Sequence, residues 1–205
     1  VDDVIEMYYM MFVQIQNDMN DLESNLMDEI NWANYTVNWA YMDLNGADLS
    51  NADLRYANLF DADLRQADLR YAYLRQADLR NADLTDADLT DANLEGADLR
   101  YAYLSNANLR NADLTDADLR NADLNNANLR NADLTDADLR YAYLSNANLH
   151  DADFYGANLS NADLTNAYLY FTTLSYANLT GADLTGADVS NAYRAGVYWN
   201  DTTCP

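Results

Sequence analysis

Arginine is the residue of this chain whose placement most suggests a chemical role. The chain has no lysine, and ten of its eleven arginines stand at positions that are multiples of five. In coils of twenty residues, arginines twenty positions apart would stack about 4.8 Å above one another. One such arginine wall consists of Arg80, Arg100, Arg120 and Arg140, with Asp78, Asp98, Asp118 and Asp138 stacked beside it. Two interpretations stay open: the two ladders offset each other's charge, or the arginine wall docks an acidic segment.

A second arginine row holds Arg70, Arg110 and Arg130, and it is followed by His150. A lone histidine at the end of such a row is most simply an exposed polar residue. We expect no metal site, because zinc would need a second histidine or a cysteine cluster and no aspartate row has the spacing of a calcium loop. An uncharged column is expected on another face, formed by Asn106, Asn126, Asn146 and Asn166.

Paired tyrosines form a third candidate surface, which we call the tyrosine corners. They are Tyr71 and Tyr73, Tyr101 and Tyr103, and Tyr141 and Tyr143. The last two pairs belong to one corner, two coils apart, and the first pair belongs to the diagonally opposite corner. Exposed tyrosine pairs favour contact with a protein or stacking on a carbohydrate, and packing within the corner is the alternative.

None of these groups predicts catalysis. The carboxylates recur with the repeat and do not single out one pair, and neither a Ser/His/Asp arrangement outside the repeat nor a glycine-rich phosphate loop is present. We therefore expect a protein that is not an enzyme and that needs no cofactor.

The elements that position these residues follow from a strict period of five. From Leu44 to Val189 every fifth residue is a large apolar side chain, and the residue two positions earlier is alanine in nearly every case. A period of five matches neither a helix nor a flat strand. It fits a chain that turns a corner every five residues and points two of each five side chains inward, which predicts an all-β solenoid.

The runs Ala47-Asp48-Leu49, Ala52-Asp53-Leu54 and Ala82-Asp83-Leu84, and those that follow, resemble the pentapeptide repeat family. This resemblance implies a right-handed, quadrilateral β-helix with four pentapeptides per coil. Residues 44–193 would then make about 7.5 coils and a rod roughly 36 Å long at the ordinary strand spacing. Phe171, Thr172 and Thr173 interrupt the repeat, and we expect local distortion there.

Residues 1–43 differ in pattern and predict an amphipathic helix that ends near Asn31, followed by an aromatic segment that caps the first coil. The apolar seam of this assembly helix is Ile5, Tyr8, Phe12, Ile15, Met19, Leu22 and Leu26. Because these 43 residues contain nine acidic groups and no basic one, two copies of the helix would repel each other side by side. We expect the helix to dock instead on an arginine-bearing wall, in its own subunit or in a neighbour.

The formal net charge of −23 argues against nucleic-acid binding, because contact with phosphates needs a basic surface. No apolar run is long enough for a transmembrane helix. The chain begins with Val1, which fits either a removed signal peptide or an excised fragment. Residues 194–205 form a tail in which Cys204 is the last residue but one, and this tail resembles the ends of exported bacterial pentapeptide repeat proteins. We therefore expect an extracellular or cell-surface protein, with a cytoplasmic location as the alternative.

These features favour a structural scaffold that is not an enzyme and that assembles head to tail, as a homo-oligomer or filament or with another protein, through the N-terminal helix. The alternative comes from the family resemblance, since some members are acidic rods that mimic DNA and occupy the DNA site of a type II topoisomerase such as gyrase. A carbohydrate-binding or other ligand-binding surface on the tyrosine corners is a third hypothesis.

Overall fold

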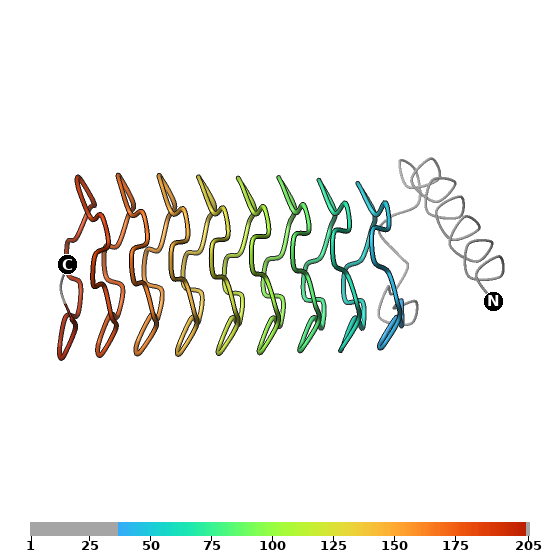
Figure 1. Cartoon of the computed structure of the whole chain (residues 1–205), viewed down its shortest axis with the longest axis horizontal. Coiled ribbons are helices and arrows are strands. Elements are labelled where there is room, and N and C mark those ends of the chain that lie inside the picture. Colours follow the sequence, from blue (N-terminus) through green and yellow to red (C-terminus); the bar gives the residue numbers. More distant parts are fainter. Residues whose placement is uncertain (1–36, 204–205) are drawn as a thin grey trace, which may run out of the picture. The chain divides into compact units, whose positions relative to one another are not determined.

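The computed structural model describes residues 37–203, which lie in one compact unit assigned to Val37–Pro205. The predicted assembly helix and Cys204 lie outside the described residues. Within residues 37–203 the backbone forms stacked coils with no helix (Figure 1). At twenty residues per coil, these 167 residues (203 − 37 + 1) make just over eight coils.

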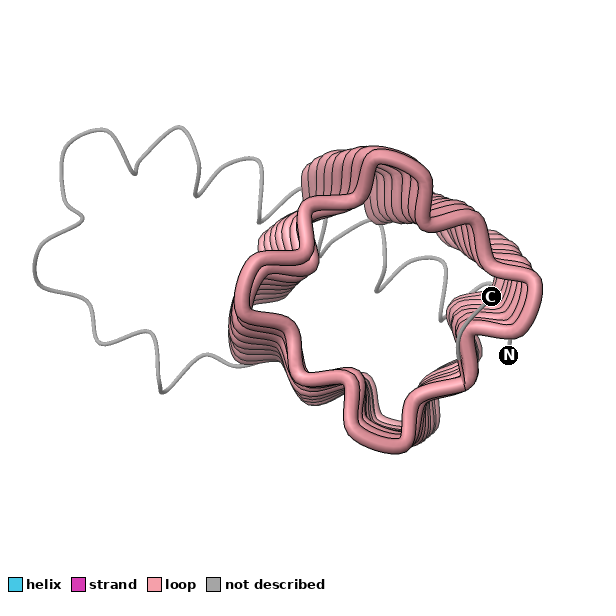
Figure 2. The backbone as a smooth tube through the Cα atoms, turned by 90° about the vertical axis from the view of Figure 1, so that its left-hand side faces the viewer, coloured by secondary structure: helices cyan, strands magenta, loops and turns pink. Residues whose placement is uncertain are grey.

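Neighbouring coils are joined by parallel β-bridges between residues twenty positions apart. The bridges recur at every fifth residue, from Asn38↔Asn58 to Asp183↔Thr203. Each side of a coil contributes a single bridging residue, because a corner follows before a longer strand can form. Viewed along the stack, the coils superpose on one four-sided outline (Figure 2). The solenoid expected from the period of five is therefore present, with the four-sided coil that the family resemblance implies.

Each corner is a turn closed by the backbone. The amide of the inward alanine donates to the carbonyl of the apolar residue three positions before it, as Ala87 does to Leu84 at 3.0 Å. The third residue of every turn has a positive φ, from Tyr41 at 63° to Asp201 at 53°. Positive φ at this position is the mark of a type II turn. It explains why asparagine, aspartate and glycine prevail there, since these residues tolerate the left-handed region best.

The core is a thin column of leucine and alanine inside the coils. From Leu54 to Leu149 every inward leucine is 0% exposed, and the inward alanines from Ala57 to Ala182 are at most 1% exposed. Phe154 takes a leucine position and is also fully buried. Because only two of five side chains face inward, each coil is stabilised mainly by the coil above and the coil below.

The coils extend beyond the predicted limits of 44–193 at both ends. Asn38 and Asp43 bridge to the second coil, and Tyr198 and Thr203 bridge to the preceding coil at the other end. Trp39 therefore occupies the place of an inward leucine, with its amide donating to the carbonyl of Asn58 at 2.8 Å. Residues that the sequence predicts as caps or tail thus continue the repeat, because the backbone register tolerates other side chains at the open ends.

The expected distortion at Phe171–Thr173 is wrong. Thr172 is fully buried in the position of an alanine, and its Oγ1 donates to the carbonyl oxygen of Leu149 at 2.7 Å. Thr173 keeps its bridges to Asp153 and Tyr193. The hydroxyl is accommodated because it finds an acceptor in the coil below, so its burial leaves no polar group without a partner.

Candidate functional site

The four sides of the coil expose different chemistry, and we name them by their bridging residues. The first face carries Asp78, Asp98, Asp118 and Asp138; the second carries Asp63, Asp83, Tyr103, Asp123 and Tyr143; the third carries Asp88, Asn108, Asn128 and Asn148; the fourth carries Asn93, Asp113, Asp133 and Asp153. The residue two positions after each bridging residue begins the corner and points its side chain along the same face. Each face is therefore a pair of parallel side-chain ladders.

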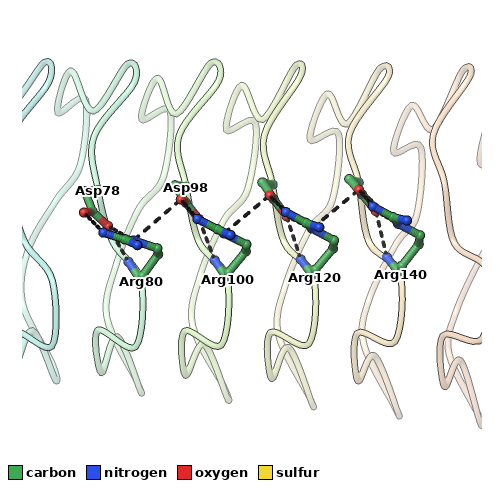
Figure 3. A network of polar contacts seen from close by, with 8 residues as sticks. Asp78, Arg80, Asp98, Arg100, Arg120 and Arg140 are labelled. Atoms are coloured by element: carbon green, nitrogen blue, oxygen red, sulfur yellow. Dashed lines mark hydrogen bonds and ion pairs between the residues drawn. The ribbon is translucent and has the colours of Figure 1, made fainter.

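The arginine wall lies on the first face, where every arginine is paired with aspartate (Figure 3). In one repeat Arg80 Nη2 is 2.6 Å from Asp78 Oδ2, and Arg80 Nε donates to Asp78 Oδ1 at 2.7 Å. The same Nε lies 3.6 Å from Asp98 Oδ2 of the next coil. The pattern repeats up to Arg140, so forked pairs within coils and longer contacts between coils form one continuous zipper.

The zipper also shifts the ionisation of its members. The side-chain hydrogen bond from Arg80 holds the pKa of Asp78 below its ordinary value, and the same bond raises the pKa of Arg80. These side chains remain about one third exposed, at 40% for Arg80 and 30% for Asp78. Partial solvent exposure weakens each pair, so the zipper neutralises the first face more than it stabilises the fold.

On the third face Arg110 and Arg130 lack such partners. Both side chains are exposed, and within residues 37–203 neither lies within ion-pair distance of a carboxylate. The reason is local: the residue two positions earlier is Asn108 or Asn128, whereas in each paired repeat of the arginine wall it is aspartate. This difference between Asn-Leu-Arg and Asp-Leu-Arg is visible in the sequence, and it is the signal that separates free from paired arginines.

Two chains of amide hydrogen bonds border these arginines along the stack. Asn128 Nδ2 donates to Asn108 Oδ1 at 3.1 Å, and Asn108 Nδ2 donates to Asp88 Oδ1 at 3.1 Å. At the adjacent corner Asn131 donates to Asn111 at 3.0 Å, and Asn111 donates to Asp91 at 2.8 Å. The expected asparagine column from Asn106 to Asn166 stacks too, but no side-chain hydrogen bond joins its members in the part described.

His150 continues the row of Arg130 and packs against aromatic rings. Its ring centroid lies 5.3 Å from that of Tyr170 and 6.3 Å from that of Phe171, and the latter two are 4.2 Å apart. Nδ1 of His150 is 2.8 Å from Asp151 Oδ2 but lacks hydrogen-bond geometry. The predicted exposed histidine is thus partly buried, and an aromatic cluster ends the third face.

The tyrosine corners project into solvent. Their six side chains are between 51% and 56% exposed, and no ring contact involves them within the described coils. Tyr101 and Tyr141 sit at the positive-φ position of the same corner, two coils apart, both with φ of 61°. These rings are available for contact with another molecule, and packing within the corner leaves about half of each side chain uncovered.

The fourth face is acidic. Asp113, Asp133 and Asp153 stack there, and in residues 37–203 each lacks a basic partner. Asp113 accepts the amide of the residue two positions on, Thr115, at 3.0 Å. No group of three potential metal ligands occurs among the described residues, and no described helix could cross a membrane.

Comparison with known proteins agrees with this geometry. The family model described as Pentapeptide repeats matches eight copies, at residues 37–70, 57–96, 92–131, 132–169 and 162–193. No curated protein matches the chain significantly.

Among solved structures, HetL from Nostoc sp. strain PCC 7120, a pentapeptide repeat protein involved in heterocyst differentiation regulation, is 35% identical, with 82% of this chain and 87% of that chain covered and a TM-score of 0.49. The Nostoc PCC 7120 protein alr5209 is 40% identical over 47% of this chain and 74% of its own, with a TM-score of 0.30. QnrB1, a plasmid-mediated fluoroquinolone resistance protein, is 22% identical over 83% of this chain and 86% of its own, with a TM-score of 0.41. The repeat match over most of the chain, together with the twenty-residue coil, shows that the chain belongs to the pentapeptide repeat family.

Proposed function

We propose that this protein is a scaffold without enzymatic activity, which binds other proteins and assembles head to tail with copies of itself. The observation that carries the proposal is the unbroken bridge register from Asn38 to Thr203. It holds the outward side chains of each face in regular ladders along the stack, whereas a reaction would need a set of groups that departs from the repeat. A rigid rod with distinct faces suits the positioning of partners.

The tyrosine corners support a protein partner. Tyr101 with Tyr103, and Tyr141 with Tyr143, offer four half-exposed rings on one edge of the rod. Tyrosine is enriched at protein interfaces because it supplies a large contact area together with a hydroxyl group. Head-to-tail assembly follows if the acidic N-terminal segment of one copy binds the coils of the next, since such a contact is heterologous and propagates.

Light scattering coupled to gel filtration, with negative-stain electron microscopy, tests the assembly. The full chain is compared with a variant that lacks residues 1–36, the division between the two units. We expect assemblies in the full chain that disappear in the truncated one. A full chain that stays monomeric at high micromolar concentration would refute self-assembly.

A second candidate is a DNA mimic that binds a type II topoisomerase, as the family resemblance implies. The observation that favours it is the fourth face, where Asp113, Asp133 and Asp153 form an acidic ladder without basic partners in the described coils. A supercoiling assay with gyrase distinguishes the two functions. No inhibition or protection at micromolar protein would exclude the mimic, and loss of an effect in an Asp133→Asn variant would support it.

A further inference from the structure

The third face differs from the rest of the rod in charge. We define the third-face patch as Asn108, Arg110, Asn128, Arg130, Asn148 and His150. Segments 106–111, 126–131 and 146–151, which carry the patch, contain two arginines and one carboxylate, Asp151, in a chain of net charge −23. The patch is therefore neutral to positive in charge, whereas the molecule as a whole is strongly acidic.

The arginines of the patch are free to bind a new partner, unlike those of the arginine wall. On the wall the Nε and Nη2 groups already donate to aspartate, as at Arg100 and Asp98 with distances of 2.7 and 2.6 Å. Arg110 and Arg130 only donate their backbone amides, to Asn108 and Asn128 at 3.4 Å. Both guanidinium groups thus keep their side-chain donors available within residues 37–203, on side chains about 4.8 Å apart along the stack.

The neighbouring asparagines preserve this availability. Their amides bond to one another along the stack, from Asn128 to Asn108 and on to Asp88. Asp88, the carboxylate that ends this chain of bonds, already accepts from Asn108 and from the hydroxyl of Thr90 at 2.5 Å. At the other end the rings of Tyr170 and Phe171, which we call the aromatic ledge, lie beside His150. The patch therefore combines free guanidinium groups with an aromatic contact.

We propose that the third-face patch is the docking site for residues 1–36 of a second copy of this chain. This inference rests on the proposed function and assigns its site. Residues 1–36 contain eight acidic side chains and no basic one. Their carboxylates complement Arg110 and Arg130, and the predicted apolar seam matches the aromatic ledge. The docking site is thus on the third face and not on the opposite arginine wall, where aspartate already occupies the arginine donors.

A peptide titration tests the site directly. A fluorescein-labelled peptide of residues 1–36 is titrated with the 37–205 chain, which carries its own core and backbone network, and anisotropy is recorded. Arg110→Gln with Arg130→Gln should weaken binding about ten-fold, equivalent to about 1.4 kcal/mol. The matched control is Arg100→Gln with Arg120→Gln, which has the same spacing on the opposite face and should change the affinity less than three-fold.

The results separate the site from the function. Equal binding by both double variants, stronger weakening in the control, or no binding at all would overturn the site. A peptide of the same composition in scrambled order should bind more weakly, and equal binding would overturn the named occupant. Light scattering on the full-length double variants completes the test. If the full chain assembles and the Arg110/Arg130 variant assembles equally, the site is wrong although the function stands; if the full chain stays monomeric, the self-assembly function itself fails.

Discussion

The left-handed backbone at the third residue of each turn predicts a reversal of glycine and alanine preference between two adjacent residues. Asn126 has a φ of 59°, whereas Asn125, one residue earlier in the same turn, is not among the positive-φ residues. Alanine in the left-handed region costs about 1–2 kcal/mol. Elsewhere alanine is favoured over glycine by about 0.4–1 kcal/mol, because glycine gives the unfolded chain more freedom.

The backbone conformation at each position therefore sets both the sign and the size of the stability difference between the glycine and alanine variants. At position 126 glycine should exceed alanine in stability by about 1 kcal/mol, the difference between those two terms. At position 125 alanine should exceed glycine by about 0.4–1 kcal/mol. Asn125 Oδ1 accepts the amide of Ser145 at 3.0 Å, but alanine and glycine lose that bond equally. Because both variants lack the asparagine side chain, its contribution cancels when alanine is compared with glycine at the same position.

Thermal unfolding followed by circular dichroism measures the four single variants. For a chain of this size 1 kcal/mol corresponds to about 2–4 °C in the melting temperature. Because repeat rods need not unfold in one step, the rank order is the readout and not an extrapolated free energy. Alanine more stable than glycine at both positions, or glycine more stable than alanine at both, would contradict the assigned backbone conformations of residues 125 and 126.

Three further outcomes are expected. Leu124→Ala in the middle of the rod, where the leucine is 0% exposed, should cost about 2–5 kcal/mol, and Leu44→Ala in the first described coil should cost less in the same chemical-unfolding assay. Thr172→Val should lower the unfolding free energy by about 1 kcal/mol through loss of the buried hydroxyl bond; a more stable valine variant would contradict that bond. Burial acts to raise the pKa of Asp118, but hydrogen bonds from Arg120 outweigh it and lower that pKa below 3.8. Since the folded value lies below the unfolded one, this pair stabilises the fold above pH 3.8 and loses that contribution as the pH falls through the folded value. Arg120→Gln should therefore reduce the acid-induced loss of stability, and an unchanged pH profile would contradict the pairing.

Several features of the fold were predictable from side chains alone. A leucine every fifth residue, with alanine two positions before it, requires two inward side chains per corner, because no helix or strand buries that pattern. The stacking of Arg80 with Arg100 follows from the twenty-residue repeat. The limits of the coils were not predictable in this way, because Trp39 and Trp199 take the place of leucine at the two ends while the backbone keeps the register.

The candidate site, like the fold, was predictable from the sequence only in part. The sequence places Arg110 and Arg130 in one row, and it shows that they follow Asn-Leu, whereas the arginines of the arginine wall follow Asp-Leu. The turn geometry gives this difference its effect, because it brings an aspartate two positions earlier within reach of the guanidinium group, as it brings Asp78 to Arg80. The sequence pattern favours the arginine wall for docking, whereas the structure leaves free guanidinium groups on the third face of the described coils.

By itself, then, the sequence of this protein determined the period, the inward residues and the order of side chains along each ladder. These properties are local and repeat with the chain, so they need no knowledge of distant contacts. The tertiary structure decided the left-handed turns, the burial of the Thr172 hydroxyl against Leu149 and the pairing of each arginine. The Thr172 bond and the contacts between coils, such as that of Arg80 Nε with Asp98 Oδ2, join groups about twenty residues apart, which come together only when one coil rests on the next. The turns and the pairs within a coil, such as Arg80 with Asp78, are closed over two or three residues, and the hydrogen bonds between coils hold their backbone in place.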